Sequence, residues 1–103
     1  MYIVIFITAA NKTEADNIAG QLVKNKLAAC VNIVGNIASV FLWKAKIDSA
    51  KEVLLIVKTK KSKFSGVVKL VKSIHSYEVP EIIALPILTG ERKYLRWIGE
   101  SVR

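Results

Sequence analysis

Four side chains that can bind metal or move protons lie within seven positions of the chain: His75, Tyr77, Glu78 and Glu81. An imidazole near a carboxylate can ligate a transition metal or act with it as an acid and base pair. The spacing matches no common zinc or di-iron motif, however, and a histidine just past a helix can instead cap the last backbone carbonyls. The glutamates, on either side of Pro80, can equally be surface charges, and Tyr77 can pack with its hydroxyl bonded. The segment is a candidate metal site with a structural alternative.

Cys30 is the only cysteine of the chain and a second candidate ligand. It lies between Ala29 and Val31, in a strand-like stretch where a free thiol usually packs as a small hydrophobe. As a soft ligand it would favour copper, whereas its pairing with His75 as a nucleophile and base has no activating context in the sequence. A lone cysteine forms no internal disulfide, which suits a reducing cytoplasm.

The chain is strongly basic, with 16 Lys and Arg against eight Asp and Glu and a formal net charge of +8. Such a charge can attract nucleic acid, anionic lipid or acidic metabolites, but the lysines are spread along the chain, as on a solvated surface. An RNA-binding sheet would carry exposed aromatic residues on its central strands, and residues 53–57 contain none. The apolar runs are far shorter than the roughly 18 residues of a membrane span. Neither nucleic acid nor a membrane is an expected partner.

Hydrophobic periodicity defines the elements that must position these side chains. The predicted strands are residues 2–7, 29–43 with a bulge at Gly35-Asn36, 52–58 and 82–87, and the predicted helices are 11–25, 62–75 and 91–102. Asn11, supported by Glu14, and Ser62 are the expected N-caps of the first two helices. Pro86 is expected at a sheet edge or strand end. The polar residues 44–51 are expected to form a turn.

The order strand, helix, strand, strand, helix, strand, helix is that of an α+β protein with the ferredoxin-like split βαβ arrangement (βαββαβ) and an added C-terminal helix. Because the chain has 103 residues and no Gly/Ser/Pro-rich linker, residues 1–103 are expected to form one domain. Two helices cover one face of such an antiparallel sheet and leave the other face bare. Since 52% of the residues are apolar, we expect the bare face or the long hairpin to pack against other subunits in a homo-oligomeric ring.

Six separated stretches follow one another in the order and spacing of a known family. They are LAACVN at 27–32, FLWKAKI at 41–47, EV at 52–53, KT at 58–59, HSYEVPEI at 75–82 and YLRW at 94–97. On these motifs, which span nearly the whole chain, the sequence resembles the CutA family of divalent-cation tolerance proteins. The family's hairpin glycine is replaced here by Ala45, which is expected to alter the turn without changing the fold.

The resemblance implies a ferredoxin-like protomer in a tight homotrimer similar to the PII signalling proteins, cytoplasmic in bacteria and archaea and without enzymatic activity. It also implies weak binding of Cu(II) or another divalent cation, with a histidine matching His75 and a cysteine matching Cys30 as ligands. Some members have a second histidine and a further cysteine where this chain has Ile74 and Ile7, so a copper site here would have fewer soft donors. A tight site would then recruit Glu78, another acid, backbone atoms or a neighbouring chain.

The expected function is therefore that of a non-enzymatic, trimeric metal-response protein whose site is formed by His75, Glu78 and Cys30. The alternative is a PII-like trimeric signalling module that binds an anionic metabolite or a partner protein in its intersubunit clefts. The sequence identifies neither the metal nor any protein partner beyond further copies of the chain.

Overall fold

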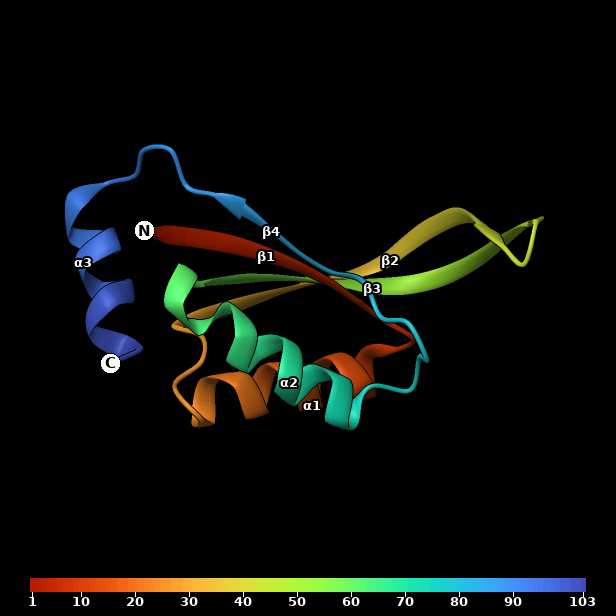
Figure 1. Cartoon of the computed structure of the whole chain (residues 1–103), viewed down its shortest axis with the longest axis horizontal. Helices are drawn as coiled ribbons and strands as arrows, with labels where there is room; N and C mark the ends of the chain where they lie inside the picture. Colours follow the sequence, from red (N-terminus) through yellow and green to blue (C-terminus); the bar gives the residue numbers. More distant parts are fainter.

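A four-stranded antiparallel sheet in the order β2-β3-β1-β4 forms the centre of the computed structural model, which describes residues 1–103. In chain order the elements are β1 (Tyr2–Ala9), α1 (Lys12–Lys24), β2 (Cys30–Trp43), β3 (Lys46–Lys60), a short 3-10 turn η1 (Lys61–Lys63), α2 (Phe64–Ile74), β4 (Ile82–Pro86) and α3 (Arg92–Ser101). This is the ferredoxin-like split βαβ arrangement with an extra C-terminal helix (Figure 1). The predicted α+β architecture is confirmed.

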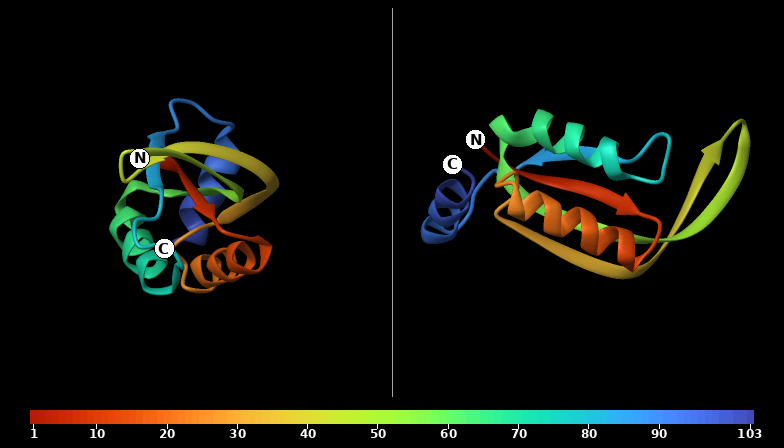
Figure 2. Two further views of the ribbon diagram at one scale, coloured as in Figure 1. Left: turned by 90° about the vertical axis from the view of Figure 1, so that its right-hand side faces the viewer. Right: turned by 90° about the horizontal axis from the view of Figure 1, so that it is seen from below.

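Helices α1 and α2 lie side by side on one face of the sheet, whereas α3 lies beyond its end, next to the start of β1 (Figure 1, Figure 2). The core is formed by side chains that alternate along the two central strands and point toward α1 and α2. They are Ile3, Ile5 and Ile7 from β1 and Val53, Leu55 and Val57 from β3. On the opposite face α3 covers only one end, where its Gly99 lies against Tyr2, and side chains such as Phe6 and Ile56 are only half-buried. One chain therefore leaves one face of its sheet partly open.

Strands β1 and β3 pair along the whole of β1, with Tyr2 opposite Lys60 near α3 and Thr8 opposite Leu54 toward the other end. Strand β4 pairs with the other side of β1 and forms an edge of the sheet. It ends at Pro86, which has no N–H to donate, as predicted for a strand end at an edge. The sheet thus has two distinct ends, one near α3 and one at the base of the β2-β3 hairpin.

The β2-β3 hairpin extends well beyond the rest of the sheet (Figure 1) and is longer than expected. Its strands pair out to Trp43 and Lys46, and the turn consists of Lys44 and Ala45 alone, with φ of 52° and 65°. The prediction of a turn over residues 44–51 is wrong. Most of this ribbon is exposed on both faces, so polar residues do not prevent strand formation there.

Strand β2 shows the predicted irregularity where the hairpin leaves the body of the protein. Its register with β3 shifts between Val34 and Ile37, and Asn36 has a φ of 57°. Asparagine adopts this left-handed conformation more readily than most residues. The bulge therefore interrupts the ladder and increases the local twist without ending the strand, which confirms the prediction of one long, bulged strand.

Asn11 caps helix α1 as predicted, because its Oδ1 accepts a hydrogen bond from the N–H of Glu14 at 2.9 Å. Glu14 in turn accepts a 2.9 Å hydrogen bond from the N–H of Ala10, so two side chains fasten the start of the helix. Ser62 does not cap α2, contrary to the prediction: it lies inside the 3-10 turn, and α2 begins at Phe64 with no side-chain cap. A residue whose own backbone is already helical cannot take the extended conformation of an N-cap.

Candidate functional site

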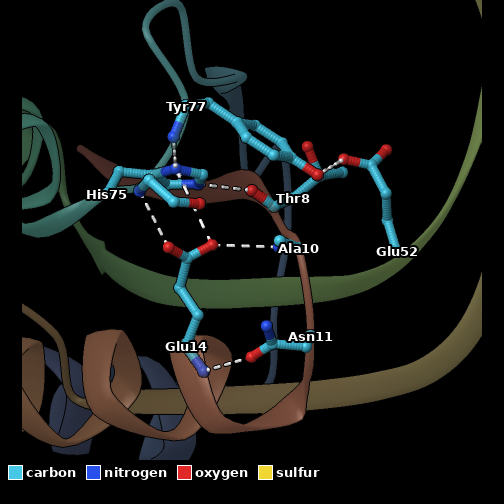
Figure 3. Close-up of polar contacts among 8 residues, drawn as sticks. Thr8, Ala10, Asn11, Glu14, Glu52, His75 and Tyr77 are labelled. Atoms are coloured by element: carbon cyan, nitrogen blue, oxygen red, sulfur yellow. Dashed lines mark hydrogen bonds and ion pairs between the residues drawn. The ribbon is translucent and has the colours of Figure 1, made fainter.

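The side chain of His75, at the end of α2, is fully buried. Both of its ring nitrogens are hydrogen-bonded within the chain (Figure 3). Nδ1 accepts a hydrogen bond from the N–H of Tyr77 at 3.0 Å, so the proton of the neutral ring lies on Nε2, which donates to the carbonyl oxygen of Thr8 at 2.7 Å. The side chain does not cap the helix carbonyls. It ties the segment after α2 to strand β1, 67 positions earlier in the chain.

Glu14 lies beside His75 and connects the start of α1 to the same segment. Its carboxylate accepts hydrogen bonds from the N–H groups of Ala10 and Ser76, at 2.9 and 2.8 Å, and its Oε1 lies 3.8 Å from Nδ1 of His75. Burial opposes ionisation of this group, but the hydrogen bonds from Ala10 and Ser76 outweigh it and lower the pKa of Glu14. Glu14 is thus a carboxylate that holds separate segments together.

Tyr77 extends the same cluster toward the hairpin (Figure 3). Its hydroxyl donates a 2.7 Å hydrogen bond to Oε2 of Glu52 on β3, and its ring centroid lies 4.7 Å from that of His75. Burial, followed by the hydrogen bond and charge of Glu52, raises the pKa of Tyr77 to about 12. Because Glu52 is only 8% exposed, the neutral phenol is the group that satisfies its buried carboxylate.

A cavity of about 750 Å³ opens beside Tyr77, between the base of the hairpin and the segment that follows α2. Four of the eight acidic residues of the chain line it: Asp48, Glu52, Glu78 and Glu81. Aromatic and aliphatic side chains of the hairpin complete the wall. Because the chain as a whole is strongly basic, this acidic cavity is a local region of negative potential that attracts cations.

The acidic cavity is not a ready-made metal centre. Nowhere in the chain are three or more His, Cys, Asp and Glu side chains arranged to hold a metal ion. Glu52 is already bonded to Tyr77, whereas Asp48, Glu78 and Glu81 are exposed. The cavity therefore offers separate carboxylates, which together with water suit a weakly bound hard or borderline divalent ion.

Cys30 lies away from this cavity, toward the α3 end of the sheet. The register places it beside Lys58 and in the row of Val4, and its Sγ lies 3.8 Å from Nζ of Lys58. His75, by contrast, is bonded to Thr8, four residues further along β1. Four strand residues span about 13 Å, so a single chain brings Cys30 and His75 to different places.

Of the three residues predicted as metal ligands, only His75 and Glu78 share a region. His75 is buried, and Glu78 is exposed at the acidic cavity. Reasoning from the sequence missed Asp48, which was assigned to a turn, and Glu52, which was assigned only to a strand. Local sequence contains no signal for the burial of Glu52, because an acid next to an inward-facing strand residue such as Val53 normally points to the other face of the sheet.

Fold and site together define a class, namely ferredoxin-like α+β proteins with a projecting hairpin and an acidic cavity at its base. The chain belongs to the CutA1 divalent ion tolerance protein family, whose model matches residues 3–101. This confirms the resemblance seen in the sequence motifs. It is 44% identical over 98 residues to the divalent-cation tolerance protein CutA of Thermus thermophilus, covering 95% of each chain, and 48% identical over 102 residues to that of Archaeoglobus fulgidus, covering 99% of each.

Solved structures of family members have the same fold. The divalent cation tolerance protein Cut A1 from Thermus thermophilus matches with a TM-score of 0.98 at 43% identity, covering 100% of both chains. The periplasmic divalent cation tolerance protein CutA from Archaeoglobus fulgidus matches with a TM-score of 0.97 at 48% identity, again covering 100% of both. The projecting hairpin and the helix α3 are thus included in the likeness.

Eukaryotic relatives are longer than this chain. The CutA homolog of Xenopus laevis is 47% identical over 97 residues, which are 94% of this chain but 64% of that protein. The chloroplastic CutA of Arabidopsis thaliana is 46% identical over 101 residues, which are 98% of this chain and 56% of that protein. The chain spans less than two thirds of each of these two proteins. The family is named for tolerance of divalent ions and not for an enzymatic reaction.

Proposed function

We propose that this protein acts in divalent-cation tolerance by binding a divalent cation weakly at the acidic cavity, without catalysing a reaction. The observation that carries the proposal is the gathering of half of the carboxylate side chains around one cavity of a chain with a net charge of +8. Only one lysine, Lys12, forms an ion pair with an acid, Asp16, so the acids of the cavity are not used to neutralise lysines. The names of the family and of its relatives support a divalent cation as the ligand.

Glu78 and Glu81 are the proposed first ligands, because they are exposed and line the cavity from one short segment. His75 joins them only by giving up the hydrogen bond that its Nδ1 accepts from Tyr77, which lowers its affinity for Cu(II) relative to an open imidazole. Cys30 contributes only to a separate site or from another copy of the chain. These conditions support weak binding of Cu(II) or another divalent ion.

Calorimetric titration of Cu(II) and Mn(II) into the chelator-treated chain tests this site. We expect Glu78→Gln to weaken binding by about tenfold, equivalent to about 1.4 kcal/mol, because it removes one charged oxygen ligand. Glu100→Gln changes the charge equally at an exposed position that does not line this cavity, and should bind as the wild type does. Equal affinity of Glu78→Gln and wild type overturns the site.

The same titration of His75→Ala separates a ligand from a structural residue. If His75 enters the site, Cu(II) binding falls while Mn(II) binding changes little, because imidazole is a preferred ligand of copper. Circular dichroism of the variant shows whether the fold survives loss of the buried ring. Unchanged Cu(II) affinity in a folded variant removes His75 from the proposed ligand set.

The second candidate is a PII-like trimeric signalling module with an anionic metabolite or partner protein in its intersubunit clefts. It is favoured by apolar surface that one chain leaves uncovered: Val40, Leu42 and Ile47 on the hairpin are 75%, 74% and 80% exposed. Such surface suits packing between copies, and clefts between copies suit small ligands. A thermal-shift screen of divalent cations and anionic metabolites separates the two candidates, because a ligand that binds the native state raises the melting temperature. A shift with cations alone favours the first candidate, and a shift with an anionic metabolite favours the second.

We expect the protein to act in the cytoplasm, since its single free cysteine suits a reducing compartment. None of the helices in the structure has the length and apolar character needed to cross a membrane. The names of relatives differ on location, with periplasmic for the Archaeoglobus fulgidus structure and chloroplastic for the Arabidopsis thaliana protein. Fractionation of the native cells measures the location directly, and recovery outside the cytoplasm contradicts the expectation.

A further inference from the structure

All three arginines of the chain line one cavity at the α3 end of the sheet. They are Arg92, Arg96 and Arg103, and Lys60 at the end of β3 adds a fourth cation to the wall. The volume of this basic cavity is about 670 Å³. Every other cationic side chain of the protein is a lysine. Arginine thus occurs only around this cavity, and all cationic side chains elsewhere in the chain are lysines.

None of these four cations is neutralised within the chain. The ion pair between charged side chains in the structure is Lys12 with Asp16, and Glu100 is the single acid that lines the basic cavity. Two of the arginines are four residues apart on α3, where like charges repel and weaken a helix. No ion pair within the chain offsets this repulsion, and a bound anion would offset it.

Strand pairing and a glycine place a neutral donor in the same cavity. Tyr2 lies opposite Lys60 in the β1-β3 ladder, and both line the cavity. A Cβ at Gly99 on α3 would come within 2.9 Å of the Tyr2 hydroxyl, so the glycine leaves room for the phenol against the helix. No buried side-chain donor of the chain lacks a partner, and this hydroxyl forms no internal hydrogen bond, so it is open to a ligand.

We propose that the basic cavity binds a small ligand that carries two or more linked phosphate groups. A guanidinium group donates paired hydrogen bonds that match phosphate oxygens, whereas a lysine ammonium acts as a point charge. Four cations against one acid leave three positive charges, which suit a diphosphate or triphosphate. The volume lies within the range of about 300–1,000 Å³ found for small-molecule sites. The inference does not depend on the cation binding proposed above.

Calorimetric titration of the chelator-treated full chain with sodium tripolyphosphate tests the proposal. We expect Arg96→Gln to weaken binding by about tenfold. Arg96→Lys keeps the charge but not the paired donors, so its affinity should lie between those of the wild type and Arg96→Gln. Lys69→Gln removes the same charge from an exposed position on α2 and should bind as the wild type does. Circular dichroism shows that each variant keeps its fold.

Three results overturn the proposal. The first is no measurable binding of tripolyphosphate by the wild type at low salt. The second is equal weakening by Lys69→Gln and Arg96→Gln, which indicates non-specific attraction to net charge. The third is tighter binding of a short single-stranded DNA through Arg96, which assigns the cavity to nucleic acid. Glu78→Gln should bind tripolyphosphate normally, so failure of the cation site leaves this result unchanged.

Discussion

Hydrogen bonds of the polar cluster of Glu14, Glu52, His75 and Tyr77 fix the position of the segment that carries Glu78. Every buried side-chain polar atom of the chain has a hydrogen-bond partner. A buried donor or acceptor that loses its partner destabilises a protein by about 1–3 kcal/mol. Loss of any one of these side chains should therefore lower the free energy of unfolding. It should change the acidic cavity only indirectly, by moving the segment that carries Glu78.

Tyr77→Phe removes the hydroxyl that satisfies Glu52 and leaves a buried carboxylate unpaired. We expect the free energy of unfolding at neutral pH to fall by about 1–3 kcal/mol, as measured by urea denaturation. Tyr2→Phe is the matched control, because the Tyr2 hydroxyl forms no hydrogen bond within the chain and its loss should change stability by no more than about 0.5 kcal/mol. Equal stability of Tyr77→Phe and wild type would contradict the role given to this hydrogen bond.

The same variant tests the alkaline titration of Tyr77. Its folded-state pKa of about 12 lies above the ordinary value of 10.0, so the folded state holds the phenol proton more tightly than the unfolded state. This contribution to stability is complete below pH 10.0 and is lost as pH rises through about 12. Ultraviolet difference titration of the wild type should show a tyrosine that ionises near pH 12, and this component should be missing from Tyr77→Phe.

Glu14→Gln tests the acid side. The folded-state pKa of Glu14 is lowered from 4.5, so its carboxylate stabilises the fold above that pH, and the contribution is lost as pH falls through the lowered value. The amide of this variant keeps the shape but not the charge that faces His75, so the variant should be less stable at neutral pH and approach the wild type in acid. Denaturation curves at several pH values measure the gap. A gap that stays constant with pH contradicts the linkage.

At this scale the sequence predicted the segment but not its partners. The type and place of His75 indicated either a ligand or a helix cap, and the structure shows a third role, a cross-link to Thr8 of β1. Local sequence contains no information on that bond, because it depends on how α2 and β1 pack. Glu14 was predicted as a capping residue, and its bond to Ser76 likewise depends on tertiary packing.

Elements with a strong apolar period were predictable, because burial against the sheet demands that period. The strands and helices around the core are in the predicted places. The exposed ends of elements were not. Polar residues of the hairpin tip indicated a turn over 44–51, yet cross-strand hydrogen bonds hold an exposed ribbon as well as a buried strand. The start of α2 was predicted wrongly because serine is a common N-cap residue, whereas Ser62 lies within the 3-10 turn that precedes the helix.

The turn of the hairpin carries a testable strain. Lys44 and Ala45 both have positive φ, as a two-residue turn joining twisted strands requires, and neither is the glycine or asparagine that adopts this conformation most readily. Ala45→Gly should stabilise the hairpin by about 1 kcal/mol, since a left-handed alanine costs about 1–2 kcal/mol and glycine avoids that cost. Hydrogen exchange of amides at the tip measures the change.

Ala38→Gly is the control for this effect, because Ala38 lies in the same hairpin within β2 and has no positive φ. Glycine there should destabilise the strand by about 0.5–1 kcal/mol. Faster exchange at the tip of Ala45→Gly than in the wild type would mean that the alanine is not strained. The family likeness agrees with the expectation that the alanine leaves the fold unchanged.

The whole molecule separates its charges along β1. The three arginines already lie within the last 12 residues of the sequence, whereas the fold brings together acids from two distant stretches, 48–52 and 78–81, at the other end of the strand. Tyr2 and Thr8 line the two cavities and are six residues apart on one strand, or about 20 Å. This exceeds the screening length of about 8 Å at physiological ionic strength, so a cation and an anion should bind without strong electrostatic coupling.

The exposed apolar surface of one chain is typical of a protein that associates with further copies of itself. The sheet face opposite α1 and α2 and the hairpin together leave large hydrophobic side chains exposed, among them Val34 and Ile83 on that face and Val40, Leu42 and Ile47 on the hairpin. Exposed apolar surface that is not scattered usually marks an interface. The two outer strands, β2 and β4, also present unpaired edges. These features support association between copies of the chain, and the homotrimer stays the expectation that the family resemblance gave.

Sedimentation velocity tests this expectation at the scale of the whole molecule. The wild type should sediment as a trimer of the 11.4 kDa chain, and its melting temperature should rise with concentration, because folding and association are then linked. Leu42→Glu places a charge on a hairpin residue that is 74% exposed in one chain, and should shift the protein toward monomer. Val23→Glu on α1, which is 47% exposed and lies on the helical face, is the matched control and should remain a trimer. A wild type that sediments as a stable monomer at every concentration contradicts the assembly and shows that these apolar side chains stay exposed to solvent.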